Sequence, residues 1–185
     1  MPLKENYKDK FTVNNLMDSK KTSGQPFNLK FAPNPSGWCR HFSGRAAKLS
    51  PADKVKVFYD AGFRAMEFNE YGGLPVEEQK AVARQMEKLG MQMGVFAPRV
   101  GSWEVPNLTG NIIDPKSRIR DKEGVKRMVR SIMESALEVG KRAGAKWFTV
   151  VIGAEDPSLE YGYQFSNAVE HLKYAADFLE KNDGP

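Results

Sequence analysis

The stretch Ala61-Gly62-Phe63 joins the end of an apolar helix to an apolar strand through one glycine, and the same junction recurs twice later in the chain. A glycine just past a helix accepts the left-handed backbone that ends it. The residues that follow each glycine have few polar breaks, as in strands that are buried on both faces. The later junctions are Leu89-Gly90-Met91 and Ala143-Gly144-Ala145, and the strands expected after the three glycines span 65–68, 91–96 and 147–152.

Repeated helix-glycine-strand units indicate parallel strands joined by crossover helices. With a short first strand over 29–32, four units occupy about 155 residues, so eight units would need about 300, as in a slightly enlarged (β/α)8 barrel. The sequence therefore predicts an α/β fold, a partial (β/α)8 TIM barrel with about four parallel β/α units, which is a half-barrel. The helices are expected to begin at Ser50-Pro51, and then to span about 75–88, 125–140 and 166–181.

Two regions differ from this pattern. Residues 1–28 are polar and are predicted to form a flexible leader, so the N-terminal half of the TIM-barrel domain is expected over 29–185. Residues 97–117 form a loop well beyond the usual length for such a connection, which predicts that this loop is either functional or mobile.

Apolar spacing predicts which face of each helix is buried. The third helix has the strongest pattern, because apolar residues recur at steps of three and four from Val125 to Gly140, opposite a face that carries Arg130 and Glu134. The second helix is expected to turn Val76, Ala83 and Met86 inward. The fourth helix is expected to leave His171 in solvent and to bury Val169, Leu172, Ala175, Ala176 and Leu179.

The composition describes a chain of 185 residues, 41% of them hydrophobic, with a net charge of +5. Six lysines and three acids in residues 1–30 place +3 of that charge there, and no basic stripe with interleaved aromatic residues follows, so a nucleic-acid partner is not expected. The single cysteine, Cys39, excludes an intrachain disulfide. Without an apolar signal or membrane-length segment, the expected location is the cytoplasm, without a membrane partner.

From Phe31 onward the chain resembles the first half of the hydroxypyruvate isomerase-like proteins, in the xylose isomerase-like TIM-barrel superfamily of sugar isomerases and epimerases. The resemblance depends on several short motifs in order across about 155 residues. These are Phe31-Ala32-Pro33, Ala61-Gly62-Phe63 with Glu67-Phe68, Leu89-Gly90-Met91 with Met93-Gly94-Val95-Phe96, Pro106-Asn107-Leu108, Ala145 to Val151, and Gly162-Tyr163-Gln164 with Asn167.

The resemblance implies a metal-assisted aldose-ketose isomerisation or an epimerisation of a small sugar or hydroxy-carbonyl substrate, with a divalent Mg or Mn ion. In the family, acidic residues with a His or Gln from the second half of the barrel hold the metal. No metal ligand and no catalytic residue is therefore assigned in this chain, which is expected to be inactive alone. Asn34 stands where many relatives carry a His.

The candidate substrate-binding residues come from the ends of the predicted strands and the loops after them, where this fold places its chemistry. Glu67 could instead pair with Arg64 or a helix terminus, and a loop tryptophan is often a packing anchor. The candidates are Asn34, Glu67, Asn69, Trp103 and Gln164, with Glu70 beside them.

Other polar residues have simpler interpretations. Glu155 and Asp156 before Pro157 are expected to form a loop turn or a helix cap, and Gly72-Gly73 a turn. His41 lacks a second His or Cys nearby, so a metal role for it is weak.

Two further functions stay open. In one, a non-catalytic half-barrel associates with itself or with a complementary chain through its exposed edges. In the other, the chain belongs to the phosphodiester-cleaving branch of the superfamily, which uses a trinuclear zinc site.

Overall fold

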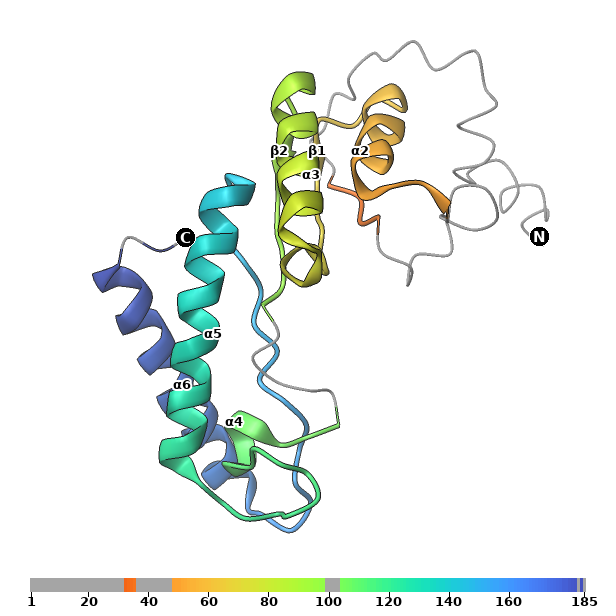
Figure 1. Ribbon diagram of the computed structural model, residues 1–185. Coiled ribbons are helices and arrows are strands. Elements are labelled where there is room, and N and C mark those ends of the chain that lie inside the picture. Colours follow the sequence, from red (N-terminus) through yellow and green to blue (C-terminus); the bar gives the residue numbers. More distant parts are fainter. Residues whose placement is uncertain (1–31, 36–47, 99–103, 183, 185) are drawn as a thin grey trace, which may run out of the picture. The chain divides into compact units, whose positions relative to one another are not determined.

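The computed structural model describes residues 32–35, 48–98, 104–182 and 184 (Figure 1). The expected leader and most of the expected first strand lie outside these residues. The contacts divide the chain into unit 1, residues 1–96 with 142–146, and unit 2, residues 97–141 with 147–185. The elements are α2 (Pro51–Asp60), β1 (Ala65–Met66), η3 (Tyr71–Gly73), α3 (Val76–Leu89), β2 (Gln92–Met93), α4 (Asn107–Gly110), α5 (Lys122–Ala143) and α6 (Tyr161–Lys181).

Helix α2 of unit 1 begins as the sequence predicts. The Ser50 hydroxyl accepts a hydrogen bond from the backbone amide of Asp53 at 3.1 Å, and Pro51 fills the first helical position. Together they satisfy or remove amide donors that the first turn leaves unpaired. The chain leaves the helix through Gly62, whose φ of 103° suits glycine.

Helix α3 confirms the predicted stop at Gly90, which has a φ of 65°. Its buried side chains are Gln79, Val82 and Met86, spaced three and four residues apart. The inward position predicted for Met86 is confirmed, and the one predicted for Val76 is wrong because Val76 is exposed in the first turn. Gln79 belongs to the buried face although its polar side chain gives no apolar signal in the sequence.

A parallel two-stranded sheet forms the centre of unit 1. Strand β1 pairs with β2 in the register Ala65 to Gln92 and Met66 to Met93. Beyond the strands, the Phe68 amide donates to the Val95 carbonyl at 2.7 Å and the Glu67 amide donates to the Pro33 carbonyl at 3.1 Å. The described ends of the first three expected strand segments therefore lie side by side in chain order.

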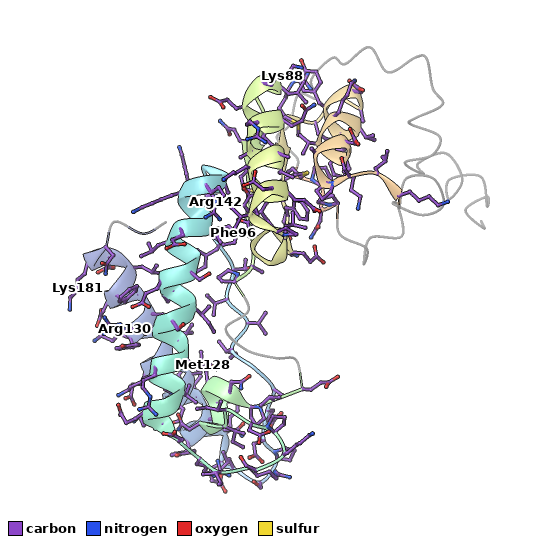
Figure 2. All side chains as sticks on the ribbon, in the orientation of Figure 1. Lys88, Phe96, Met128, Arg130, Arg142 and Lys181 are labelled. Atoms are coloured by element: carbon purple, nitrogen blue, oxygen red, sulfur yellow. The ribbon has the colours of Figure 1, made fainter. Side chains whose placement is uncertain are left out.

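Unit 2 is built around α5, which confirms the strongest apolar pattern of the sequence. Its core combines Leu108 from α4, Val125, Val129 and Met133 from α5, and Ala175 from α6. Glu170 of α6 pairs with Lys122 and Lys126 of α5. The guanidinium of Arg130, which Figure 2 labels on α5, lies over the Phe178 ring of α6 at 5.7 Å. Helices α5 and α6 therefore lie side by side in this unit.

The fourth strand expected over 147–152 is not among the named strands of the described residues, where this segment contains a single β-bridge position at Phe148, so the strand stays a prediction. Alternate side chains of this segment, Phe148, Val150 and Ile152, pack against the unit 2 core. On the other side Trp147 is 63% exposed and Thr149 is exposed, whereas Val151 is partly buried. An uninterrupted apolar run does not distinguish a strand that is buried on both faces from a segment that packs against a core through alternate side chains.

The predicted inner face of the fourth helix is also wrong in part. Helix α6 begins at Tyr161, earlier than expected, and Val169, Leu172 and Ala176 are exposed, whereas Ala175 is buried as predicted. His171, expected in solvent, is 0% exposed. The physical reason is that the buried positions include Gln164, Asn167 and His171, which bond to the loop before α6, to Thr109 of α4 and to Asn111 after it. No helix in the described part of the chain is long and apolar enough to cross a membrane.

Candidate functional site

Two predicted site residues meet in unit 1, beyond the carboxyl end of β1. The side-chain amide of Asn34 donates to Glu67 Oε1 at 3.5 Å, a long hydrogen bond between partly buried groups. The backbone bond from the Glu67 amide to the Pro33 carbonyl holds the two segments together. The edge of the sheet where this fold places its chemistry therefore contains a carboxylate next to an amide.

Asn69 and Glu70 follow directly at the same edge. Among the described residues, Asn69 Oδ1 and Glu70 Oε2 are buried without a hydrogen-bond partner. A buried acceptor without a partner costs about 1–3 kcal/mol, so native structures keep few of them without a reason. These two oxygens are suited to accept hydrogen bonds from a bound hydroxyl group. We call Asn34, Glu67, Asn69 and Glu70 the strand-end cluster.

A buried network supports the turn that follows the strand-end cluster. The Tyr71 hydroxyl donates to the Gln79 carbonyl at 2.8 Å, and the Gln79 side-chain amide donates to the Leu74 carbonyl at 2.7 Å. Gln79 Oε1 accepts a hydrogen bond from the guanidinium of Arg142. Burial raises the pKa of Tyr71 to about 12, against a smaller opposing effect of Arg142. The turn predicted at Gly72-Gly73 is confirmed as η3. The hydrogen bonds of Tyr71 and Gln79 fix this turn to α3.

Arg64, the suggested partner of Glu67, lies before β1. Its guanidinium donates to the carbonyls of Tyr59 at 3.1 Å and Phe63 at 2.8 Å, and lies 4.1 Å from the centre of the Tyr59 ring. These contacts link the end of α2 to the start of the strand. They give Arg64 a structural role that does not require Glu67.

Gln164 lies in unit 2, inside α6. Its side-chain amide donates to the carbonyls of Asp156 and Leu159, both at 3.0 Å, and its oxygen accepts from the Asp156 amide at 2.8 Å. Gln164 thereby closes the loop before α6 onto the helix. A substrate-binding role for Gln164 stays a prediction.

Asp156 confirms the predicted loop turn. Its Oδ1 accepts hydrogen bonds from the Ser158 hydroxyl at 2.6 Å and the Ser158 amide at 3.0 Å, and its Oδ2 lies 3.3 Å from the guanidinium of Arg120. The bonds from Ser158, reinforced by Arg120 and Arg118, lower the pKa of this carboxyl. Asp156 is therefore a buried, ionised anchor between two loops of unit 2.

The long loop of the sequence is ordered where the structure describes it, from residue 104. Thr109 donates to the Ala154 carbonyl at 2.5 Å, and Asn167 of α6 donates to the Thr109 carbonyl at 2.9 Å. His171 Nε2 lies 2.6 Å from Asn111 Oδ1. Sequence reasoning missed this His171 contact, because polar residues at i and i+4 on a helix usually indicate its solvent face.

Trp103 and His41 lie outside the described residues, so their predicted roles are untested. Among the residues that the structure does describe, no group of three or more His, Cys, Asp or Glu side chains could hold a metal ion. The strand-end cluster contains two carboxylates and two amides. These side chains do not form a group of three or more His, Cys, Asp or Glu residues that could hold a metal ion. The Mg or Mn ion that the resemblance implies for the full-length family stays a prediction.

The sequence matches no protein-family model and no curated protein. The fold is similar to the crystal structure of an AP endonuclease, family 2, from Brucella melitensis, with a TM-score of 0.56 and 16% sequence identity. The match covers 84% of this chain and 52% of that chain, so this chain spans about half of that structure. The likeness shows the fold alone: a mixed α/β chain with a parallel sheet, consistent with part of a TIM barrel.

Proposed function

We propose that this chain contributes part of the substrate mouth of a sugar isomerase or epimerase-like TIM barrel. The observation that carries the proposal is the strand-end cluster, where Asn34 contacts Glu67 and two buried acceptor oxygens of Asn69 and Glu70 have no partner among the described residues. Acceptors grouped in this way recognise the hydroxyl groups of a small sugar or hydroxy-carbonyl compound, because each hydroxyl supplies a donor.

The side chains divide the task of binding. The Glu67 carboxylate and the oxygens of Asn69 and Glu70 would accept hydrogen bonds from ligand hydroxyls. The Asn34 amide, which donates to Glu67, would position this carboxylate. Isomerisation also needs a metal ion that polarises the carbonyl and a group that carries the proton. We propose that the Mg or Mn site of the full barrel lies outside this chain. The chain alone is then expected to bind the ligand without converting it, and to work in the cytoplasm.

The test is a titration of the 185-residue chain with a panel of small aldoses, ketoses and hydroxypyruvate, followed by backbone amide NMR. We expect shifts at residues 67–70, and Glu67→Gln should weaken binding by about tenfold, because a hydrogen bond to a charged acceptor is replaced by a neutral one. The matched control is Glu87→Gln on the exposed face of α3. Shifts that Glu67→Gln leaves unchanged, or no binding across the panel, would contradict the proposal.

A second candidate is phosphodiester cleavage, which the likeness to a solved AP endonuclease favours. It predicts that the chain with Zn²⁺ nicks an oligonucleotide with one abasic site, and that a chelator abolishes the cleavage. Sugar-dependent shifts at residues 67–70 without nicking would support sugar binding. Nicking without such shifts would support phosphodiester cleavage.

A further inference from the structure

The side chain of Gln79 is enclosed in the interior of unit 1 and has all its bonds made. It is 3% exposed. Its Nε2 donates to the Leu74 carbonyl at 2.7 Å and to the Gly72 carbonyl at 3.4 Å. Its Oε1 accepts a hydrogen bond from the guanidinium of Arg142, in the last turn of α5 (Figure 2). A buried polar group whose bonds are all made holds the segments that it touches in one arrangement.

The turn that Gln79 holds is continuous with the strand-end cluster. Tyr71 follows Glu70 directly, is 0% exposed, and packs its ring edge-on against Phe68 with centroids 5.9 Å apart. The Gly73 amide donates to the Glu70 carbonyl at 2.9 Å. Asn69 and Glu70 therefore lie between two fixed aromatic residues, and a movement of the turn moves both of them.

Arg142 decides which way the Gln79 amide points. A guanidinium has donors and no acceptor, so only the oxygen of the Gln79 amide can face it. The NH2 group of the same amide is then aimed at the carbonyls of the turn. Without Arg142 the amide is free to rotate by half a turn, which would set its oxygen against the Leu74 carbonyl oxygen and lose the bond.

We infer that Arg142 is a positioning residue for the strand-end cluster and acts through Gln79. The contacts of the chain place residues 142–146 in unit 1, the unit that contains the cluster. A hydrogen bond from a charged donor is about twice as strong as a neutral one, which suits a group that must hold a buried amide in one orientation. What the cluster binds rests on the proposed function, whereas the hold of Arg142 on the turn is measurable without any ligand.

The first experiment uses the 185-residue chain without ligand. Arg142→Met removes the charged donor and keeps a long side chain. The amide NMR signals of residues 69–74 should shift, and amide exchange at residues 71–74 should rise about tenfold, because the turn loses a buried hydrogen bond. Arg142→Lys, which keeps a charged donor, should restore most of the protection. The matched control is Arg84→Met on the exposed face of α3, which should leave the turn unchanged.

A double-mutant cycle with Gln79→Ala tests whether Arg142 acts through Gln79. In a chain that already carries Gln79→Ala, Arg142→Met should change exchange at the turn little further, since residues that act through one contact are not additive. If Arg142→Met does not fold, Arg142→Gln replaces it. Additive effects, or a turn that the loss of Arg142 leaves unchanged, would overturn the inference.

The second experiment repeats the titration with aldoses, ketoses and hydroxypyruvate at a temperature at which every variant is folded. For a compound that binds the unaltered chain, the dissociation constant should rise about tenfold in Arg142→Met and largely recover in Arg142→Lys. A lower free energy of unfolding with an unchanged dissociation constant would show a structural role only, which overturns the inference. If the unaltered chain binds none of these compounds, the proposed function is rejected, and the ligand-free experiment decides the positioning role by itself.

Discussion

His171 Nε2 lies 2.6 Å from Asn111 Oδ1, and this contact joins helix α6 to the turn that ends α4. A carbonyl oxygen accepts, so Nε2 carries the hydrogen and Nδ1 is the unprotonated nitrogen. Nδ1 is buried and has no hydrogen-bond partner among the described residues. Protonation of Nδ1 would place a buried donor without an acceptor, and the folded protein therefore favours neutral His171.

The stability of unit 2 should fall in acid below about pH 6.5. Burial lowers the pKa of His171 from 6.5, with opposing smaller effects from Glu170 and Glu123 and supporting ones from Lys126 and Lys122. The unfolded chain then binds the proton first, so stability is complete above the unfolded pKa and is lost as the pH falls toward the folded one, by up to about 1.4 kcal/mol per pH unit.

The measurement is the free energy of unfolding by urea between pH 7.5 and 5, with the amide exchange of α6 as the reporter of unit 2. His171→Gln keeps a donor for Asn111 but has no proton to gain, so it should remove most of this pH dependence. A slope that is the same in both proteins would assign the effect to other groups.

Gly153→Ala should destabilise unit 2 by about 2 kcal/mol or more, because backbone strain and a steric clash add together. Gly153 has a φ of 105°, and a Cβ there would lie 2.5 Å from the Val105 carbonyl oxygen and 2.8 Å from the Asn107 amide nitrogen. Gly73→Ala is the matched control, since a Cβ at Gly73 meets nothing within 4 Å. Thermal unfolding of the two variants should therefore separate them clearly.

Gln79→Ala should lower the free energy of unfolding of unit 1 by about 1–3 kcal/mol, because it leaves the Leu74 carbonyl without its donor. The same change should loosen the η3 turn, which amide exchange at residues 72–74 would detect. Glu78→Ala, one residue earlier on the exposed face, is the control and should leave exchange at the turn unchanged. Equal effects of the two substitutions would contradict the anchoring role of Gln79.

Ser50→Ala should destabilise α2 by about 1 kcal/mol, the usual cost of losing an N-cap. The Ser50 hydroxyl is the acceptor for the Asp53 amide at 3.1 Å, and alanine offers none. Ser131→Ala, on the exposed face of α5, removes a hydroxyl without removing a cap and serves as the control. Denaturant unfolding monitored at the α2 amides should show a lower free energy of unfolding for Ser50→Ala and no change for Ser131→Ala.

Local signals predicted the helices well. The cap at Ser50, the stops at Gly62 and Gly90 and the buried stripe of α5 depend on neighbouring residues only, and each is confirmed. The strand expected over 147–152 corresponds to a single bridge position at Phe148 in the structure, and an apolar run indicates how much a segment is buried but not which segment pairs with it. The inner face of α6 failed because its partners, Thr109 and Asn111, lie about 60 residues earlier in the chain.

The strand-end cluster was partly predictable. Asn34, Glu67 and Asn69 were identified from their places after expected strands, and the structure brings Asn34 and Glu67 into contact. Glu70 is named beside these candidates from its place in the sequence, but the burial of its Oε2 without a partner is a property of the surroundings and needs the structure.

The sequence by itself determined where α2, α3 and α5 lie, the cap at Ser50, the stop at Gly90 and the alternation of helices with apolar segments, because these follow from the preferences of residues that are close in the chain. Tertiary structure alone decided that Gln79 and His171 are buried and that Val169 and Leu172 are exposed. The physical reason is hydrogen bonding: a polar side chain is buried where other segments supply its partners, and apolar residues on the remaining face of the same helix then stay exposed.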